Sequence, residues 1–102
     1  EGGLAIAVFR IFQEILSNIA RHARARQVWI RIAVDEPPAP TLYLEVRDDG
    51  IGARPEQLNA PRSYGVMGMH ERAAPFGGRV NIETAPGQGM RVRLVMPLEV
   101  SQ

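Results

Sequence analysis

Apolar side chains recur at helical spacing over the first quarter of the chain. Residues 4–24 hold neither Pro nor Gly, and their apolar positions repeat every three or four residues: Phe9, Phe12, Leu16, Ile19, Ala20 and Ala23. Ile11 and Ile15 widen this apolar face. Because the repeat matches the 3.6-residue turn, we predict one long helix over residues 4–24 that packs through this face.

Two stretches that alternate apolar and polar residues follow this helix. Residues 27–34 place four apolar side chains on one face: Val28, Ile30, Ile32 and Val34. Residues 41–48 do the same with Leu42, Leu44 and Val46. A period of two predicts half-buried strands, and the proline-rich segment between them favours a turn. We therefore expect an antiparallel hairpin whose apolar face is covered.

The second half of the chain predicts a loop, a helix and two more strands. Residues 49–64 are polar and broken by Gly and Pro, with one turn of helix expected near residues 56–58; a loop of this length is usually functional. Residues 66–76 read as helix, stopped by Gly77 and Gly78, and residues 79–84 and 90–97 as strands. The fold class expected is α+β: a two-layer α/β sandwich whose sheet of about four strands carries helices on one face.

Composition narrows the classes of function. The chain has 102 residues, 45% of them apolar, which suits a single domain over residues 1–102. Cysteine is absent, which excludes disulfides and thiolate metal sites and fits a reducing compartment. All 12 basic residues are Arg, yet the net charge is only +1, which argues against nucleic acid as a partner. No apolar run approaches the ~20 residues of a membrane span, so we expect no membrane contact by this domain.

The long helix carries a polar group that could do chemistry. Glu14, Asn18, Arg21 and His22 follow one another at i, i+4, i+7 and i+8, so they share one helix face. A solvated polar face is the plainer interpretation. Two details favour a site: Asn is a poor residue for a helix interior, and a carboxylate one turn from an amide oxygen suits Mg²⁺.

Three glycine motifs stand beside predicted strands and helices. Asp48-Asp49-Gly50-Ile51-Gly52 follows the second strand, and Gly65-Val66-Met67-Gly68-Met69 opens the second helix. Gly87-Gln88-Gly89 precedes the last strand. Each alone is compatible with an ordinary turn or helix cap. A glycine loop that leads into a helix also suits phosphate binding, because free N–H groups point at the ligand there.

The order and spacing of these motifs resemble the ATP-binding domain of the GHKL superfamily, which includes DNA gyrase, heat-shock chaperones, histidine kinases and MutL proteins. Within it, the chain is similar to bacterial two-component sensor histidine kinases of the nitrate-sensor-like subfamily. The segments that carry this likeness are Phe9–Asn18, Arg21-His22-Ala23, Gly68-Met69-His70-Glu71-Arg72 and Phe76-Gly77-Gly78. The resemblance covers residues 8–97 and implies a Bergerat-type ATP-binding fold with a mixed, mostly antiparallel sheet.

The resemblance implies a role for each motif residue, with ATP and Mg²⁺ as cofactors. Asn18 would be the Mg²⁺ ligand, Glu14 a catalytic base or positioning group, and Asp48 the acceptor for the adenine amine. Residues 53–64 would form an ATP lid. The remaining ATP-binding positions would be Arg21, His22, Gly50, Gly52, Gly65, Val66, Gly68 and Met69. One departure is Met90, which stands where the family usually has Thr; a thioether cannot donate a hydrogen bond.

The function implied is transfer of the ATP γ-phosphoryl group to a histidine. The only histidines here, His22 and His70, lie inside the nucleotide motifs. We therefore expect the acceptor on a dimerisation and phosphotransfer domain of the same parent kinase, absent from this chain, with a response regulator downstream. A cytoplasmic, monomeric domain that binds ATP and ADP is expected. Two alternatives remain open: a degenerate nucleotide-binding module and an anti-sigma-factor serine kinase of the same fold.

Overall fold

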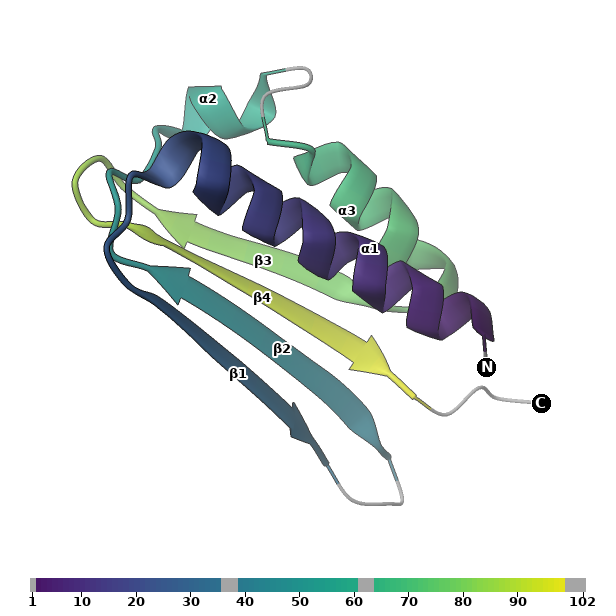
Figure 1. Cartoon of the computed structure of the whole chain (residues 1–102). Helices are drawn as coiled ribbons and strands as arrows, with labels where there is room; N and C mark the ends of the chain where they lie inside the picture. Colours follow the sequence, from purple (N-terminus) through teal and green to yellow (C-terminus); the bar gives the residue numbers. More distant parts are fainter. Residues whose placement is uncertain (1, 36–38, 61–63, 99–102) are drawn as a thin grey trace.

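The elements follow the order that the sequence predicts. The structure is a computed structural model that describes residues 2–35, 39–60 and 64–98. Figure 1 shows α1 (Gly2–Asn18), which continues as the π-helical turn η1 (Ile19–Ala23), then β1 (Val28–Val34), β2 (Thr41–Asp48) and α2 (Pro55–Asn59). The chain goes on through α3 (Val66–Ala73), the 3₁₀ turn η2 (Ala74–Phe76), β3 (Arg79–Thr84) and β4 (Met90–Pro97).

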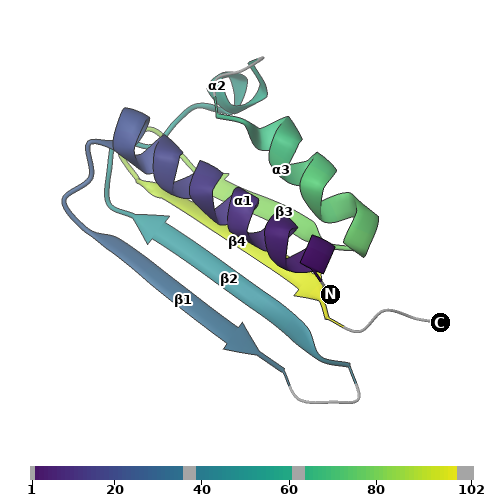
Figure 2. The ribbon, with the colours of Figure 1, turned by 45° about the vertical axis from the view of Figure 1, so that its right-hand side comes forward.

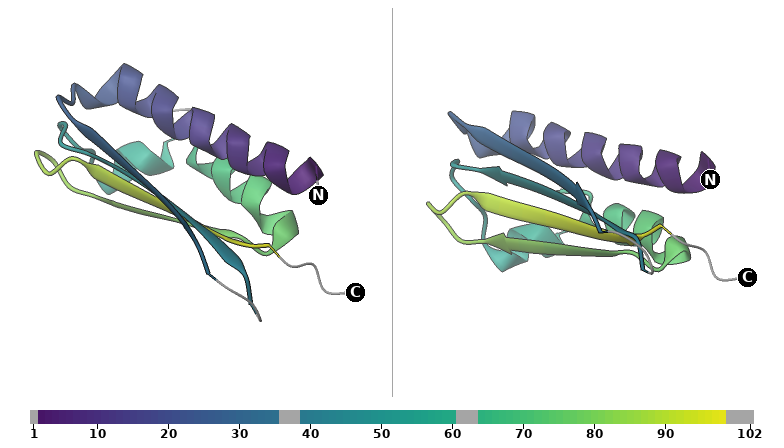
Figure 3. Two further views of the ribbon diagram at one scale, coloured as in Figure 1. Left: turned by 60° about the horizontal axis from the view of Figure 1, so that its bottom comes forward. Right: turned by 90° about the horizontal axis from the view of Figure 1, so that it is seen from below.

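The four strands form one sheet in the order β1-β2-β4-β3, and each neighbouring pair is antiparallel. Helices α1 and α3 lie together on one face of this sheet (Figures 1 and 3). The predicted α+β two-layer architecture is thus confirmed. In the register of the sheet, Met90 lies opposite both Asp48 and Thr84. The end of β2, the end of β3 and the start of β4 therefore meet at one end of the sheet, next to the glycine motifs around Gly52 and Gly89.

The core lies between the two helices and the three strands β2, β4 and β3. Ile11 and Ile15 of α1 are fully buried against it, as is Met69 of α3. The predicted centre of the buried α1 face was wrong, because Phe9 is 57% exposed and Leu16 is also exposed. A helix that rests on a sheet through Ile11 and Ile15 turns Phe9 toward its flank, because successive residues are about 100° apart.

The first strand differs from its prediction. Its inner side chains were expected to be half-buried, yet Val28, Ile30, Ile32 and Val34 are all exposed. The cause is topological: β1 is the edge strand, and Figure 2 shows it lying away from both α1 and α3. Over the described residues, no helix covers the side of β1 that continues the apolar face of β2.

The α1–η1 helix also corrects an expectation about membranes. Residues Gly2–Ala23 are long and apolar enough to cross a membrane by length and composition alone. The expectation that no apolar run approaches this length was therefore wrong. In this fold the helix lies along the sheet and buries Ile11 and Ile15, so part of its apolar character belongs to the core.

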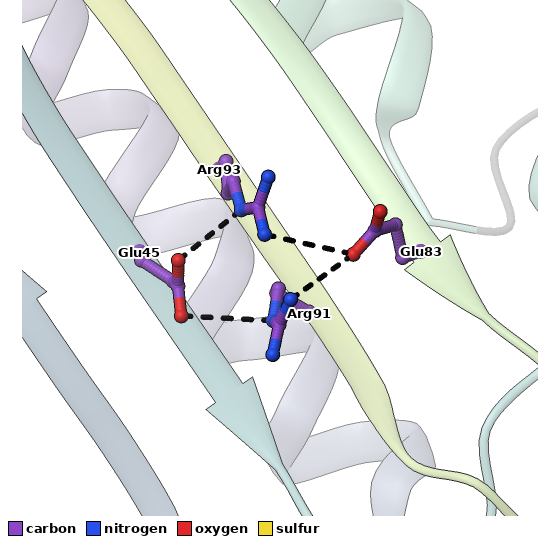
Figure 4. A network of polar contacts seen from close by, with 4 residues as sticks. All are labelled: Glu45, Glu83, Arg91 and Arg93. Atoms are coloured by element: carbon purple, nitrogen blue, oxygen red, sulfur yellow. Dashed lines mark hydrogen bonds and ion pairs between the residues drawn. The ribbon is translucent and has the colours of Figure 1, made fainter.

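The opposite face of the sheet is polar. Figure 4 shows Arg91 and Arg93 of β4 between Glu45 of β2 and Glu83 of β3. Arg93 lies 3.2 Å from Glu45, and Arg91 lies 3.3 Å from Glu83. Exposed ion pairs of this kind contribute roughly 0–1 kcal/mol each. Their main effect is to keep this face compatible with water, which leaves the helical side as the place for a buried site.

Candidate functional site

A pocket lies beneath the junction of α1 with η1, over the ends of the central strands. Six of the residues expected at an ATP site line it: Asn18, His22, Asp48, Gly52, Val66 and Met69. Its floor is apolar and comes from alternate, inward-facing positions of three strands: Val46, Ile82 and Val92. Glu14, Arg21, Gly50, Gly65 and Gly68 are not among its lining residues. The predicted residues thus gather at one end of the fold, but only part of the set faces the cavity.

Asp48 ends β2 and is the acidic group of the pocket. It is 5% exposed, and its Oδ1 atom accepts a hydrogen bond from the Gly50 N–H at 2.7 Å. Burial raises the pKa of the Asp48 carboxyl, and the Gly50 hydrogen bond partly opposes this rise. A carboxylate has four acceptor positions, so the contact to Gly50 leaves capacity for a donor from a ligand.

The two glycines after Asp48 hold their loop against its neighbours. A side chain on Gly50 would collide with the Ala23 carbonyl of η1, and one on Gly52 with the Ala85 carbonyl. Gly52 also has φ +68°, a conformation that favours glycine. Both were expected to be ATP-binding positions; the structure places Gly52 in the lining and Gly50 against η1.

The hydroxyl group of Thr84, which was not among the expected site residues, connects the loop after β2 to the turn before β4. Thr84, the last residue of β3, accepts a hydrogen bond from the Ala53 N–H at 3.0 Å and donates one to the Gly89 carbonyl at 2.6 Å. Met90, at the position of the usual Thr, lines the pocket beside Asp48. A threonine that ends a strand is common, so nothing in the sequence alone distinguished Thr84.

The polar face of α1 is organised around one guanidinium. Nη2 of Arg21 lies 3.3 Å from Oε2 of Glu14 and 3.2 Å from Oδ1 of Asn18. Asn18 is buried, and its Nδ2 atom donates to the Tyr64 carbonyl at 2.6 Å. Both polar atoms of the Asn18 amide are therefore engaged, one with a cation and one with the backbone just before α3.

The donor set can be tested against the expected Mg²⁺. No cluster of three or more His, Cys, Asp or Glu that could hold a metal occurs among the described residues. Mg²⁺ in phosphate-transfer sites nevertheless often takes one or two protein oxygens, with phosphates and water supplying the rest. The oxygens of Glu14 and Asn18 already share one cationic nitrogen, that of Arg21, so they fit a shared cation.

Tyr64 fills space at the end of the pocket next to His22. The tyrosine is 7% exposed, and its ring centroid lies 4.5 Å from that of His22. Nε2 of His22 is buried and has no hydrogen-bond partner in the described part of the chain. The free volume of the pocket is about 20 Å³, room for little more than one water molecule. A nucleotide can therefore enter only if side chains such as Tyr64 move.

The start of α3 rests on the polar face of α1. Gly65 has φ +64°, and a side chain there would meet the carboxyl carbon of Glu14 at 2.7 Å. Leu58, from α2, lines the pocket from the opposite side. The expected lid, residues 53–64, thus contains the short helix α2, while its residues 61–63 lie outside the described part.

The comparisons with known proteins show the family. Residues 3–100 match the model of the histidine kinase-, DNA gyrase B- and HSP90-like ATPase family, so the chain belongs to that family. It is 34% identical to the sensor histidine kinase LiaS of Bacillus subtilis, over 94% of this chain and 26% of LiaS. It is 31% identical to the sensor protein VraS of Staphylococcus aureus, again over 94% of this chain and 26% of VraS. The chain thus spans about a quarter of these relatives.

Solved structures agree on the fold. The histidine kinase domain of the blue-light activated histidine kinase EL346 of Erythrobacter litoralis superposes with a TM-score of 0.72 at 19% identity. The match covers 94% of this chain and 45% of that one. At this identity the likeness concerns the fold, while the sequence relatives carry the family assignment.

Proposed function

We propose that this chain is the ATP-binding catalytic domain of a sensor histidine kinase. In this proposal it binds Mg-ATP and presents the γ-phosphoryl group to a histidine on a dimerisation and phosphotransfer domain of the same parent kinase. The phosphoryl group then passes to a response regulator. The observation that carries the proposal is the convergence of Asn18, His22 and Asp48 on one pocket in a chain of this family.

Different residues would contact the two ends of the nucleotide, the base and the phosphates. Asp48, buried at the end of β2, would accept a hydrogen bond from the adenine amine, with Met90 and Val92 packing on the base. Arg21 and His22 would neutralise phosphate charge at the other end. Transfer forms a bond from an imidazole nitrogen to the γ-phosphorus and breaks the bond to the β-phosphate oxygen, releasing ADP. The protein contributes mainly position and charge to such a transition state.

We propose that binding of Mg²⁺ would rearrange the existing contacts of Arg21 with Glu14 and Asn18. Asn18 Oδ1 would bind Mg²⁺, which when bound supplies charge neutralisation between the phosphates. Arg21 would leave its place between Glu14 and Asn18 and contact phosphate instead. Glu14, released from Arg21, would position or deprotonate the incoming imidazole.

A comparison of two variants tests the metal assignment. Asn18→Ala should remove the gain in ADP affinity that Mg²⁺ gives, while affinity without Mg²⁺ stays close to that of the parent chain. Ser17→Ala, one residue earlier and exposed, is the matched control. Calorimetry with and without Mg²⁺ measures both. If Asn18→Ala weakens binding equally in the two conditions, Asn18 is not the ligand.

Two finer assignments belong to the same proposal. The segment from Gly68 to Arg72 and the Phe76-Gly77-Gly78 stop support the nitrate-sensor-like subfamily of kinases. The relatives support a cytoplasmic position for this domain within its parent, because they are bacterial sensor kinases. The residues upstream of Glu1 in the parent sequence would check both assignments.

A degenerate nucleotide-binding module is the second candidate, and two observations favour it. The pocket holds Tyr64 and a free volume of about 20 Å³, and Met90 replaces a hydroxyl. The parent kinase incubated with γ-labelled ATP separates the two functions. Acid-labile phosphohistidine that disappears in Glu14→Gln, with ADP affinity retained, supports the kinase. Nucleotide binding without any label supports the module.

A further inference from the structure

The side of the sheet opposite α1 and α3 is rich in arginine. Alternate residues of a strand point to the same side of a sheet, so the register places these side chains in three rungs. The rungs are Trp29, Arg47, Arg91 and Glu83, then Arg31, Glu45, Arg93 and Asn81, and then Ala33, Tyr43, Val95 and Arg79. We name these residues the outer face. Arginines outnumber carboxylates on it, so it is the cationic side of a nearly neutral chain.

Arg91 and Arg93 are already paired with carboxylates. Figure 4 shows both guanidiniums between Glu45 and Glu83, at distances of 3.2 to 3.9 Å. Arg31 stands opposite Glu45 in the register, yet the Glu45 carboxylate turns toward β4 instead. Among the residues that the structure describes, Arg31 therefore has no ion pair.

Arg47 is the second guanidinium without a carboxylate. It forms no ion pair within the described ranges, and its Cζ atom lies 4.1 Å from the centroid of the Trp29 ring. Stacking occupies the flat side of a guanidinium and leaves the N–H groups at its edge for a carboxylate. Trp29 is 41% exposed and Tyr43 is 39% exposed. Tryptophan, tyrosine and arginine dominate the binding energy of protein interfaces, so this composition is typical of a docking surface.

Two shallow hollows lie between these side chains. Arg31 and Arg93 border one of about 360 Å³, and Arg47 and Arg91 border the other, of about 340 Å³. The carboxylates that line the hollows are already bonded, to arginine or, for Asp35, to a tyrosine hydroxyl. Each hollow thus has one guanidinium that can take a carboxylate from outside the chain.

The spacing of Arg31 and Arg47 indicates the shape of a partner. They form a diagonal pair on neighbouring strands, about 7 Å apart where the side chains begin. Carboxylates at positions i and i+4 of a helix begin about 6 Å apart, which is a close match. An extended segment laid on the face would leave backbone N–H and C=O groups without partners, whereas a helix bonds its own. A helix is therefore the element that fits.

We propose that the outer face is a docking surface for a separate protein that presents an acidic helix. Two carboxylates one turn apart on that helix bind the guanidiniums of Arg31 and Arg47, and a neighbouring apolar side chain packs on Trp29. Strand spacing and rise per residue give the outer face an area of about 400 Å², against about 800 Å² per partner in a stable complex. The contact therefore forms and dissociates rapidly, which suits a separate protein rather than a permanent part of this molecule.

A second copy of this chain does not match the outer face. In a two-fold symmetric contact the same patch meets itself, which would bring arginine against arginine. The described helices α1, α2 and α3 each carry a single carboxylate, Glu14, Glu56 and Glu71, so none presents the acidic pair. The outer face also lies on the other side of the sheet from Asp48, so this proposal does not depend on the nucleotide function.

A synthetic peptide tests the proposal, with Trp29, the only tryptophan of the chain, as the reporter. The probe is an alanine-based helix with Glu at positions i and i+4 and Leu at i+7. The control peptide has the same composition with Glu at i and i+2, which face apart. Anisotropy of the labelled peptides measures affinity, and Trp29 emission with the unlabelled ones reports the place of binding. We expect the probe to bind at least about threefold more tightly than the control at low salt and to shift the emission.

Two variants locate the contact. Arg31→Gln combined with Arg47→Gln should weaken binding of the probe by about tenfold, because each exposed ion pair contributes up to about 1 kcal/mol. Arg10→Gln, at an exposed position on α1, is the matched control and should leave binding of the probe unchanged. ADP affinity should change less than twofold in both variants, which separates failure here from failure of the nucleotide proposal.

The remaining outcomes would each overturn the proposal. Equal affinity for the two peptides, or equal loss in Arg10→Gln and the double variant, would show a general electrostatic attraction. No binding of the probe at low salt would show that the outer face is an ordinary solvated surface. Tighter binding of a DNA duplex, or of vesicles that contain phosphatidylserine, that the double variant abolishes would assign the outer face to another class of partner.

Discussion

Asp48 is the residue on which recognition of the base depends in our proposal. Asp48→Asn keeps an oxygen for the Gly50 N–H but turns an amide NH₂ toward the adenine NH₂. Losing one buried hydrogen bond costs about 1–3 kcal/mol, which is about 5- to 150-fold in affinity. We expect ADP affinity to fall by that factor in calorimetry. Asp49→Asn, next to it but exposed, serves as the control; equal affinity in Asp48→Asn and the parent chain would refute the assignment.

The stability of the parent chain should depend on pH through the Asp48 carboxyl. Burial raises the pKa of Asp48 above its ordinary value of 3.8, so the folded chain binds the proton more tightly than the unfolded chain does. The stability from this group is therefore present below pH 3.8 and is lost as pH rises through the raised folded value. Asp48→Asn should lose this dependence and be at least as stable as the parent chain at pH 7.

Thr84 offers a residue-scale test of the hydroxyl that the sequence analysis missed. Thr84→Val keeps the shape and leaves the Ala53 N–H and the Gly89 carbonyl without their partner. An unsatisfied part-buried group costs about 1–3 kcal/mol, which lowers the Tm of a domain this size by several degrees at least. Thr84→Ser should recover most of the loss. A Thr84→Val chain that melts with the parent chain would show that the two hydrogen bonds are not important.

The elements show what the sequence could and could not predict. Strands β2, β3 and β4 begin and end where the alternation predicts, because each has one buried face. The helical repeat correctly predicted α1 but not its orientation, since Phe9 and Ile11 are both apolar and only the packing decides which faces the sheet. For the site, the spacing of the motifs predicted that Asn18 and Asp48 belong to one pocket. It could not predict the roles of Tyr64 and Thr84, because their contacts join segments that are distant in the sequence.

At the element scale, the segment before α3 should control entry to the pocket. Tyr64→Ala removes the ring that lies against His22 and opens the phosphate end. We expect faster association of ADP in stopped-flow measurements, together with a lower Tm because a buried aromatic side chain is lost. Tyr64→Phe retains the ring and should behave like the parent chain. Slower or unchanged association in Tyr64→Ala would show that Tyr64 does not obstruct the nucleotide.

For the molecule as a whole, we expect the isolated chain to be a monomer with negligible autophosphorylation. The charges are mixed and nearly balanced, which gives no strong attraction between copies. His22 stands one turn from Asn18 on the same helix face and would approach phosphates from the side, whereas transfer needs a nearly in-line nitrogen. Light scattering and incubation with γ-labelled ATP are the measurements. Stoichiometric acid-labile label on His22 or His70 would contradict this expectation.

The loop after Asp48 is tied on two sides by backbone hydrogen bonds. Ile51 donates to the Ala23 carbonyl at 2.8 Å, and its own carbonyl accepts from Gly87 at 2.7 Å. One end of the pocket is thus held by main chain, whereas the other is closed by side chains that can change rotamer. In our proposal, a nucleotide would bind to such a site in two steps, with the base before the phosphates. Under this proposal, the adenine would bind at the end held by main chain, and the triphosphate would then displace Arg21 and Tyr64 from their present places. In our proposal, a nucleoside without phosphates would occupy the site and leave Arg21 between Glu14 and Asn18.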